Sequence, residues 1–167
     1  GGRSYEDNAE RFMLLCRVGE LLAEDAFGLR WRPDVVHCND WQTALLPLLL
    51  HARRPRPALV FTIHNLAYQG LFPYEELARL GIAPHYFHPD ALEFHGSLSF
   101  IKGGIVFADR VTTVSPSYAR EIQTPAFGHG LDGLLRHRSP VLSGILNGID
   151  TTAWNPARDP SLALNYG

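Results

Sequence analysis

The sequence predicts an α/β fold in which helices cover both faces of a parallel β-sheet. Short apolar runs rich in β-branched residues alternate along the chain with segments whose apolar residues recur at helical spacing. That alternation is typical of parallel strands joined by right-handed crossovers. The run at 58–63 also lacks the alternation of a half-exposed strand, which suits a sheet covered on both sides.

The first predicted helix begins near Asp7, because Asp7 and Glu10 have the spacing of a capping box. Apolar residues then recur at helical period at Phe12, Leu15, Val18, Leu22 and Ala26, and Met13, Leu14 and Leu21 broaden that face. We expect this helix to be well buried and to end at Gly28. The first strand follows at about residues 35–38.

The middle of the chain contains a second predicted helix, at about 41–53, in which Pro47 is expected to introduce a kink. A strand at about 58–63 follows. A long irregular stretch, about 65–97, comes next and includes one short helix near 74–80.

The last third is predicted to contain three helices and two strands. Ser115 is expected to cap a helix that has Pro116 at its first position. The elements in order are a helix at about 98–108, a strand at 111–114, a helix to about 123, a short helix at about 130–136 and a strand at about 141–146.

Composition excludes several kinds of partner. The 167 residues carry a formal net charge of -2, and the longest basic run is Arg53–Arg54, so we expect no nucleic-acid or membrane-surface partner. No apolar segment reaches the roughly 18 residues that a membrane span needs. Cys16 and Cys38 both lie in apolar runs, which predicts buried, reduced thiols in a cytosolic-type compartment.

Polar side chains follow three of the predicted strands. Asp40 and Trp41 follow the first, His64 the second and Asn147 the last. Because the carboxyl ends of parallel strands meet at one edge of a sheet, these side chains should face a common site. Their hydroxyl-binding and aromatic character suits a polyhydroxylated ligand.

Each of these residues also has a structural interpretation. His64 could instead bond to loop backbone, Asp40 could cap the next helix, and Trp41 could be a core residue. Asn147 and Gly148 form a frequent turn pair. The spacing alone leaves these alternatives open.

Two further motifs, a histidine pair and a Lys-Gly-Gly sequence, do not match a metal site or a phosphate-binding loop. No cysteine or acid completes a zinc set with His85 and His88, so no metal is expected. Lys102-Gly103-Gly104 lacks the spacing of a phosphate-binding loop and does not follow a strand, so its glycines are expected to allow close helix–sheet packing.

Four longer motifs occur in order: D-V-V-H-C-N-D-W-Q-T-A-L, V-F-T-I-H-N-L-A-Y-Q-G, F-I-K-G-G-I-V-F-A-D-R-V-T-T-V-S-P-S-Y-A-R-E-I and L-N-G-I-D-T-T-A-W-N-P. They resemble the bacterial glycogen synthase and plant starch synthase family, and the resemblance runs from about Tyr5 to Asp159. The family transfers glucose, with retention of configuration, from ADP-glucose to the non-reducing end of an α-1,4-glucan. It needs no cofactor or metal, and its fold has two Rossmann-like domains facing across a cleft (GT-B).

The resemblance implies that residues 1–147 are part of the amino-terminal, acceptor-side domain. Residues 148–167 would start the segment leading to a carboxyl-terminal nucleotide-binding domain, which this chain would need. The chain has no initial Met, and we expect it to be an inactive fragment of a longer cytoplasmic protein, or a plastid protein in a plant.

The resemblance also assigns roles. His64 would contact the donor glucose, with its backbone carbonyl near the reacting carbon, and Asn147 would contact the donor side. Asp40 and Trp41 would help to place the acceptor glucan. The pocket wall would be formed by Asn65, Tyr68 and Gln69.

Departures from the family pattern keep two rival functions open. The family's amino-terminal Lys-Thr-Gly-Gly-Leu loop does not occur in these 167 residues, nor do the nucleotide pocket and diphosphate-binding residues. Gln42 stands where some members carry His, which puts an acceptor role there in doubt. The rivals are a glucan-binding module without catalysis and a related retaining transferase that uses UDP-glucose.

Overall fold

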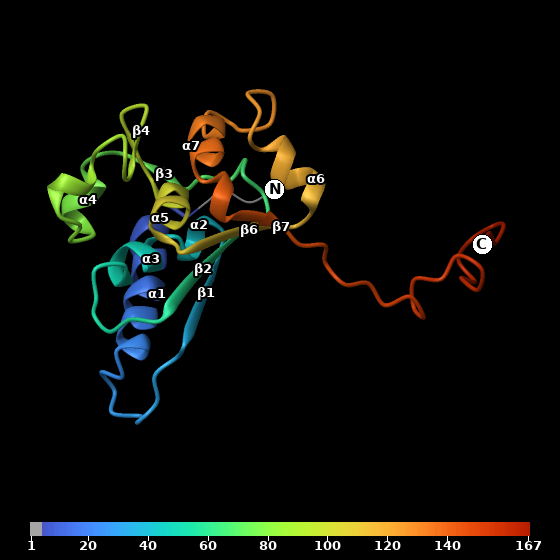
Figure 1. The fold of residues 1–167 in the computed structure, drawn as a ribbon, viewed down its shortest axis with the longest axis horizontal. Coiled ribbons are helices and arrows are strands. Elements are labelled where there is room, and N and C mark those ends of the chain that lie inside the picture. Colours follow the sequence, from blue (N-terminus) through green and yellow to red (C-terminus); the bar gives the residue numbers. More distant parts are fainter. Residues whose placement is uncertain (1–4) are drawn as a thin grey trace.

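The computed structural model describes residues 5–167 and confirms the α/β fold (Figure 1). Its main sheet has four parallel strands in the order β1-β2-β6-β7. They are β1 (Val35–Asn39), β2 (Ala58–Ile63), β6 (Arg110–Thr113) and β7 (Leu142–Gly144). Sequential strands are therefore neighbours, and every crossover advances across the sheet in the same direction.

The helices follow the predicted order, with shorter bounds. They are α1 (Asn8–Ala23), α2 (Asp40–Thr43), α3 (Leu45–Leu50), α4 (Glu76–Arg79), α5 (Phe100–Phe107), α6 (Pro116–Glu121) and α7 (Asp132–His137), with 3₁₀ turns at Pro84–Tyr86 and Ser139–Val141. The expected cap of α6 is present, because Ser115 Oγ accepts a hydrogen bond from Tyr118 N at 2.9 Å. Within residues 5–167, no helix combines the length and apolarity needed to cross a membrane.

A small antiparallel sheet interrupts the connection between β2 and α5. Its strands are β3 (Leu71–Phe72), β4 (Glu93–Phe94) and β5 (Ser97–Ser99), in the order β3-β5-β4. The sequence predicted irregular structure here. Strands of two or three residues are too short to show a period-2 pattern, and the pairing of β3 with β5 joins residues far apart in the chain.

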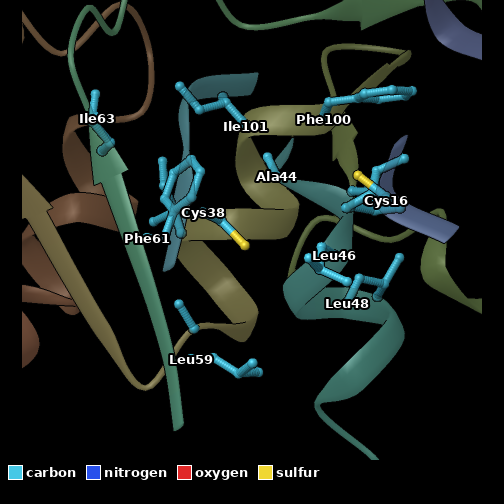
Figure 2. Packing of buried hydrophobic residues seen from close by; sticks show 14 of the residues in the cluster. Cys16, Cys38, Ala44, Leu46, Leu48, Leu59, Phe61, Ile63, Phe100 and Ile101 are labelled. Atoms are coloured by element: carbon cyan, nitrogen blue, oxygen red, sulfur yellow. The ribbon is translucent and has the colours of Figure 1, made fainter. Parts of the chain in front are cut away.

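The buried apolar residues of the sheet and helices form one continuous cluster on one face of the sheet. Phe61 points from β2 toward α5 and is fully buried (Figure 2). A Cβ at Gly104 of α5 would lie 2.5 Å from the Phe61 ring. The expectation that these glycines permit close helix–sheet packing is therefore confirmed.

The opposite face of the sheet is open along β1 within the described residues. Val35, His37 and Asn39 are all exposed there. A row of polar side chains crosses this face, with His37 Nε2 2.7 Å from Thr62 Oγ1 and Thr62 Oγ1 2.6 Å from Thr112 Oγ1. The described helices thus cover one face, whereas the sequence predicted cover on both.

Helix α1 differs from its prediction in its cap, its end and its buried face. Asp7 makes no side-chain capping bond, and the helix ends at Ala23, not at Gly28. Five of the apolar residues expected to be buried are exposed: Leu14, Leu15, Val18, Leu21 and Leu22. Because apolar residues surround most of this helix, the pattern could not select a face, and the small residues Cys16 and Gly19 lie against α2 and α3 instead.

The helix expected at 41–53 is interrupted at Ala44, three residues before Pro47, and is thereby divided into α2 and α3. Proline lacks the N–H that would bond to the carbonyl four residues earlier, and its ring clashes with that carbonyl. The carbonyl four residues before Pro47 belongs to Thr43, the last residue of α2. Pro47 therefore interrupts the helix about one turn before its own position.

Cys16 and Cys38 are confirmed as free and buried. Desolvation by burial raises the pKa of each thiol to about 12. Both thiols therefore remain protonated at neutral pH, and they act as small apolar core residues.

Asp109 is predicted to make the protein sensitive to acid. Its carboxylate accepts two hydrogen bonds from Arg56, both 2.7 Å, and one from Leu59 N. The Arg56 hydrogen bonds, helped by that of Leu59, lower the pKa of Asp109. A depressed folded-state pKa gives stability that is present above the ordinary aspartate value, about 3.9, and is lost as the pH falls through the folded value.

Asp109→Asn should therefore lower stability at pH 7 and flatten the fall in stability below about pH 4. Urea denaturation at several pH values measures both effects. This role would be contradicted if the unfolding free energy fell as steeply below about pH 4 in Asp109→Asn as in the wild type. Asp159→Asn, in the carboxyl-terminal segment, is the matched control.

Candidate functional site

The polar groups at the carboxyl ends of β1 and β2 form one hydrogen-bonded cluster. The backbone N–H of His64, directly after β2, donates to Asp40 Oδ1 at 2.8 Å. His64 Nε2 lies 2.9 Å from Asn39 Oδ1, the last residue of β1. With Nε2–H as the donor, Nδ1 is left as an acceptor. The exposed imidazole is therefore oriented by the neighbouring strand and open to a ligand.

Asp40 holds this cluster through an uncommon backbone conformation. Its φ is +55°, a left-handed value that aspartate tolerates better than most residues. The helix that begins at Asp40 has no side-chain capping bond. The alternative in which Asp40 caps the helix is therefore not what the structure shows; its carboxylate instead fixes the start of the loop after β2.

Trp41 lies in an aromatic cluster. Its ring is 4.8 Å from Phe12, 5.9 Å from Phe72 and 6.3 Å from Phe100, measured between ring centroids. Gly70 has a φ of +61°, and a Cβ there would lie 2.4 Å from the Trp41 ring. The indole therefore supports the loop that carries His64, as the core interpretation of Trp41 expected.

The other residues of the expected pocket wall follow His64 in this loop. Asn65 and Tyr68 are exposed, whereas Gln69 is buried. Asn65 Oδ1 accepts from Ala67 N at 3.0 Å, which forms a tight turn. Gln69 Nε2 donates to the carbonyl of His129 at 3.0 Å, so Gln69 ties the loop to the segment before α7. Only Asn65 and Tyr68 present side chains at the surface.

Asn147 is not brought to His64 by the structure. It is exposed and lies three residues beyond the end of β7, in a segment that runs away from the sheet (Figure 1). Its role at the donor side stays a prediction.

Three residues of the site were not predicted as such. Asn39 bonds to His64, and Thr43 Oγ1 holds the Asn39 backbone by accepting from Asn39 N at 2.6 Å and donating to Asn39 O at 2.8 Å. Tyr118 of α6 accepts from Leu66 N through its hydroxyl at 3.0 Å. The polar strand end signalled Asn39, but no local pattern marks a tyrosine 52 residues from its partner.

The described residues offer no ready metal site. Within residues 5–167, no group of three or more His, Cys, Asp or Glu side chains is placed to hold a metal ion. His88, from the histidine pair, accepts a hydrogen bond from Asp90 N at 3.2 Å. Buried Lys102, on α5, donates hydrogen bonds to the carbonyls of Pro89 and Glu93. It therefore ties the segment around β4 to α5. Desolvation lowers the pKa of Lys102.

Comparison with known proteins matches this geometry to one family. The family model described as "Starch synthase catalytic domain" matches residues 1–137. The glycogen synthase 1 of Methylococcus capsulatus is 66% identical over 166 residues, and the glycogen synthase of Marinobacter nauticus is 61% identical over 166 residues. In both cases the match covers 99% of this chain and 34% of the relative.

A solved structure agrees with the sequence matches. The catalytic domain of starch synthase IV from Arabidopsis thaliana, bound to ADP and acarbose, superposes with a TM-score of 0.79 at 35% identity. The superposition covers 98% of this chain and 34% of that one. The chain therefore spans about a third of the length of these relatives, and it belongs to the starch synthase catalytic domain family.

Proposed function

We propose that the protein containing this chain is a glycogen or starch synthase. It transfers glucose from ADP-glucose to the non-reducing end of an α-1,4-glucan, with retention of configuration. The observation that carries the proposal is the cluster of Asn39, Asp40 and His64 at the carboxyl edge of the sheet, in a chain of this family. The Arabidopsis relative bound to ADP and acarbose supports a nucleotide and a glucan-like ligand.

Retaining glucose transfer of this kind depends more on positioned dipoles than on reactive side chains. An oxocarbenium-like transition state is stabilised by preorganised groups that need no rearrangement during reaction. His64 supplies such a group: its backbone N–H is fixed by Asp40, the first residue of α2, and its ring by Asn39, the last residue of β1. Its carbonyl would face the reacting carbon, and its ring would contact the donor glucose.

The other candidate residues take supporting roles. The Oδ2 atom of Asp40 makes no hydrogen bond with residues 5–167, which leaves it able to accept from an acceptor-glucan hydroxyl. Trp41 acts on the acceptor side by holding the loop at Gly70. Asn65 and Tyr68 would form the wall and Gln69 would brace it, whereas Asn147, which lies beyond the end of β7, would contact the donor side only in the complete protein.

The remainder of the protein would complete the site. Since the chain spans about a third of its relatives, we assign ADP binding to a second, carboxyl-terminal domain that begins after residues 148–167. Closure of the two domains would exclude water, which otherwise competes with transfer. The reaction needs no metal or cofactor, and we place the protein in the cytoplasm.

A donor assay tests this function. The purified full-length gene product is incubated with maltohexaose and either labelled ADP-glucose or labelled UDP-glucose, and chain extension is measured. Extension from ADP-glucose is expected. Extension from UDP-glucose alone would establish the rival transferase, and glucan binding without extension from either donor would favour the non-catalytic module.

Asn39 is predicted to act through His64. Asn39→Ala removes the bond to His64 Nε2 and frees the imidazole to rotate, so kcat should fall about tenfold while the KM for maltohexaose changes little. Steady-state kinetics measure both values. A larger effect on KM than on kcat would contradict the role. Asn155→Ala is the control, because Asn155 Oδ1 accepts a local hydrogen bond from Ala157 N in the carboxyl-terminal segment and has no assigned role in the site.

A further inference from the structure

A cavity of about 650 Å³ lies at the opposite end of the sheet from His64. Its walls come from the end of α1, from the residues just before β1 and from those just before β2, at the lower end of the sheet in Figure 1. We call it the arginine cavity, because Arg32, Arg53, Arg54 and Arg56 line it together with a single acid, Glu24.

Two of the four arginines are already neutralised. Arg53 pairs with Glu20 at 2.8 Å and with Glu24 at 2.9 Å. Arg56 makes its two-pronged pair with Asp109. These pairs fix the cavity wall but leave little charge for a ligand.

The other two arginines carry uncompensated charge. Among residues 5–167, Arg54 donates only to the carbonyls of His51 and Arg53, at 2.8 and 2.6 Å. Arg32 makes no hydrogen bond or ion pair with residues 5–167. The four arginines of the cavity thus outnumber their three acidic partners, in a chain whose formal net charge is -2. Concave positive surfaces of this kind concentrate anions.

The shape of the cavity is also that of a ligand site. Its volume falls within the roughly 300–1,000 Å³ of small-molecule pockets, which is more than a phosphate ion alone would fill. Pro33, Pro55 and Pro57 line it and restrict the backbone on which Arg32 and Arg54 sit. Guanidinium groups bind phosphate oxygens in a two-pronged geometry.

We propose that the arginine cavity binds a small metabolite through its phosphate group, with Arg32 and Arg54 as the phosphate ligands. The site is separate from the candidate catalytic edge, because it lies at the amino ends of β1 and β2 whereas His64 lies at the carboxyl end of β2. A ligand bound there would therefore not take part in the transfer step.

Calorimetric titration of the full-length gene product tests the site, with ribose 5-phosphate, inorganic phosphate and ribose as probes. Ribose 5-phosphate should bind and ribose should not. R32Q/R54Q should weaken binding of ribose 5-phosphate at least about tenfold, because two charge-assisted contacts are lost. The control R120Q/R158Q removes the same charge from exposed positions outside the cavity and should change the affinity by less than about twofold.

Three results would overturn the proposal. They are no binding of ribose 5-phosphate up to about 10 mM, equal affinity in wild type and R32Q/R54Q, and tighter binding of inorganic phosphate than of ribose 5-phosphate. The single variant Arg32→Gln repeats the test if the double variant unfolds, because Arg32 makes no hydrogen bond or ion pair within residues 5–167 that the substitution would remove. The readout is binding, so it stands apart from any glucose-transfer result.

Discussion

Replacing His64 by alanine in the full-length protein should lower kcat by about 10²–10³-fold while glucan affinity changes by less than about threefold. The imidazole is held by Asn39, and in the proposed function it contacts the donor glucose. That contact would strengthen as charge develops, so its loss should affect the transition state more than the ground state.

Two measurements and one control define this result. Initial rates of glucose transfer give kcat, and equilibrium binding of maltohexaose gives glucan affinity. His137→Ala removes an exposed imidazole on α7, away from the sheet edge, and should leave both values unchanged. Equal losses of turnover and glucan affinity in His64→Ala would contradict a donor-side role.

The largest effect on stability is expected at Phe61. Its ring is fully buried between β2 and α5, and Gly104 leaves room for it. Phe61→Ala removes the ring and leaves a cavity that the backbone at Gly104 cannot fill, which should cost about 3–5 kcal/mol of unfolding free energy. Urea denaturation measures the change.

Phe127→Ala is the matched control for this substitution. The Phe127 side chain is 54% exposed, so its removal should cost less than about 1 kcal/mol. Similar losses of unfolding free energy in the two variants would show that the contact between β2 and α5 is not a major source of stability.

The sheet and its polar edge were predictable because the signals are local. The strands at 35–38, 58–63 and 111–114 match β1, β2 and β6 to within one residue at each end. Each is an apolar run bounded by polar or turn residues. The polar residues after β1 and β2 follow from the same boundaries, which is why Asp40 and His64 could be placed at one edge before their bond was known.

Other features depend on contacts that no local pattern records. Asn39 and Tyr118 act on partners 25 and 52 residues away. The buried face of α1 was not predictable, because apolar residues surround that helix and small residues decided the packing. The last strand was predicted over six residues but spans Leu142–Gly144, since a 3₁₀ turn takes its first position.

The most direct test of the central claim compares two proteins in one assay. Transfer of glucose from labelled ADP-glucose to maltohexaose is measured for the 167-residue chain and for the full-length gene product. We expect transfer by the full-length protein alone, because in the proposed function this chain would supply only the His64 side of the cleft and a second domain would bind the nucleotide. Transfer by the 167-residue chain, or by neither protein, would contradict the account.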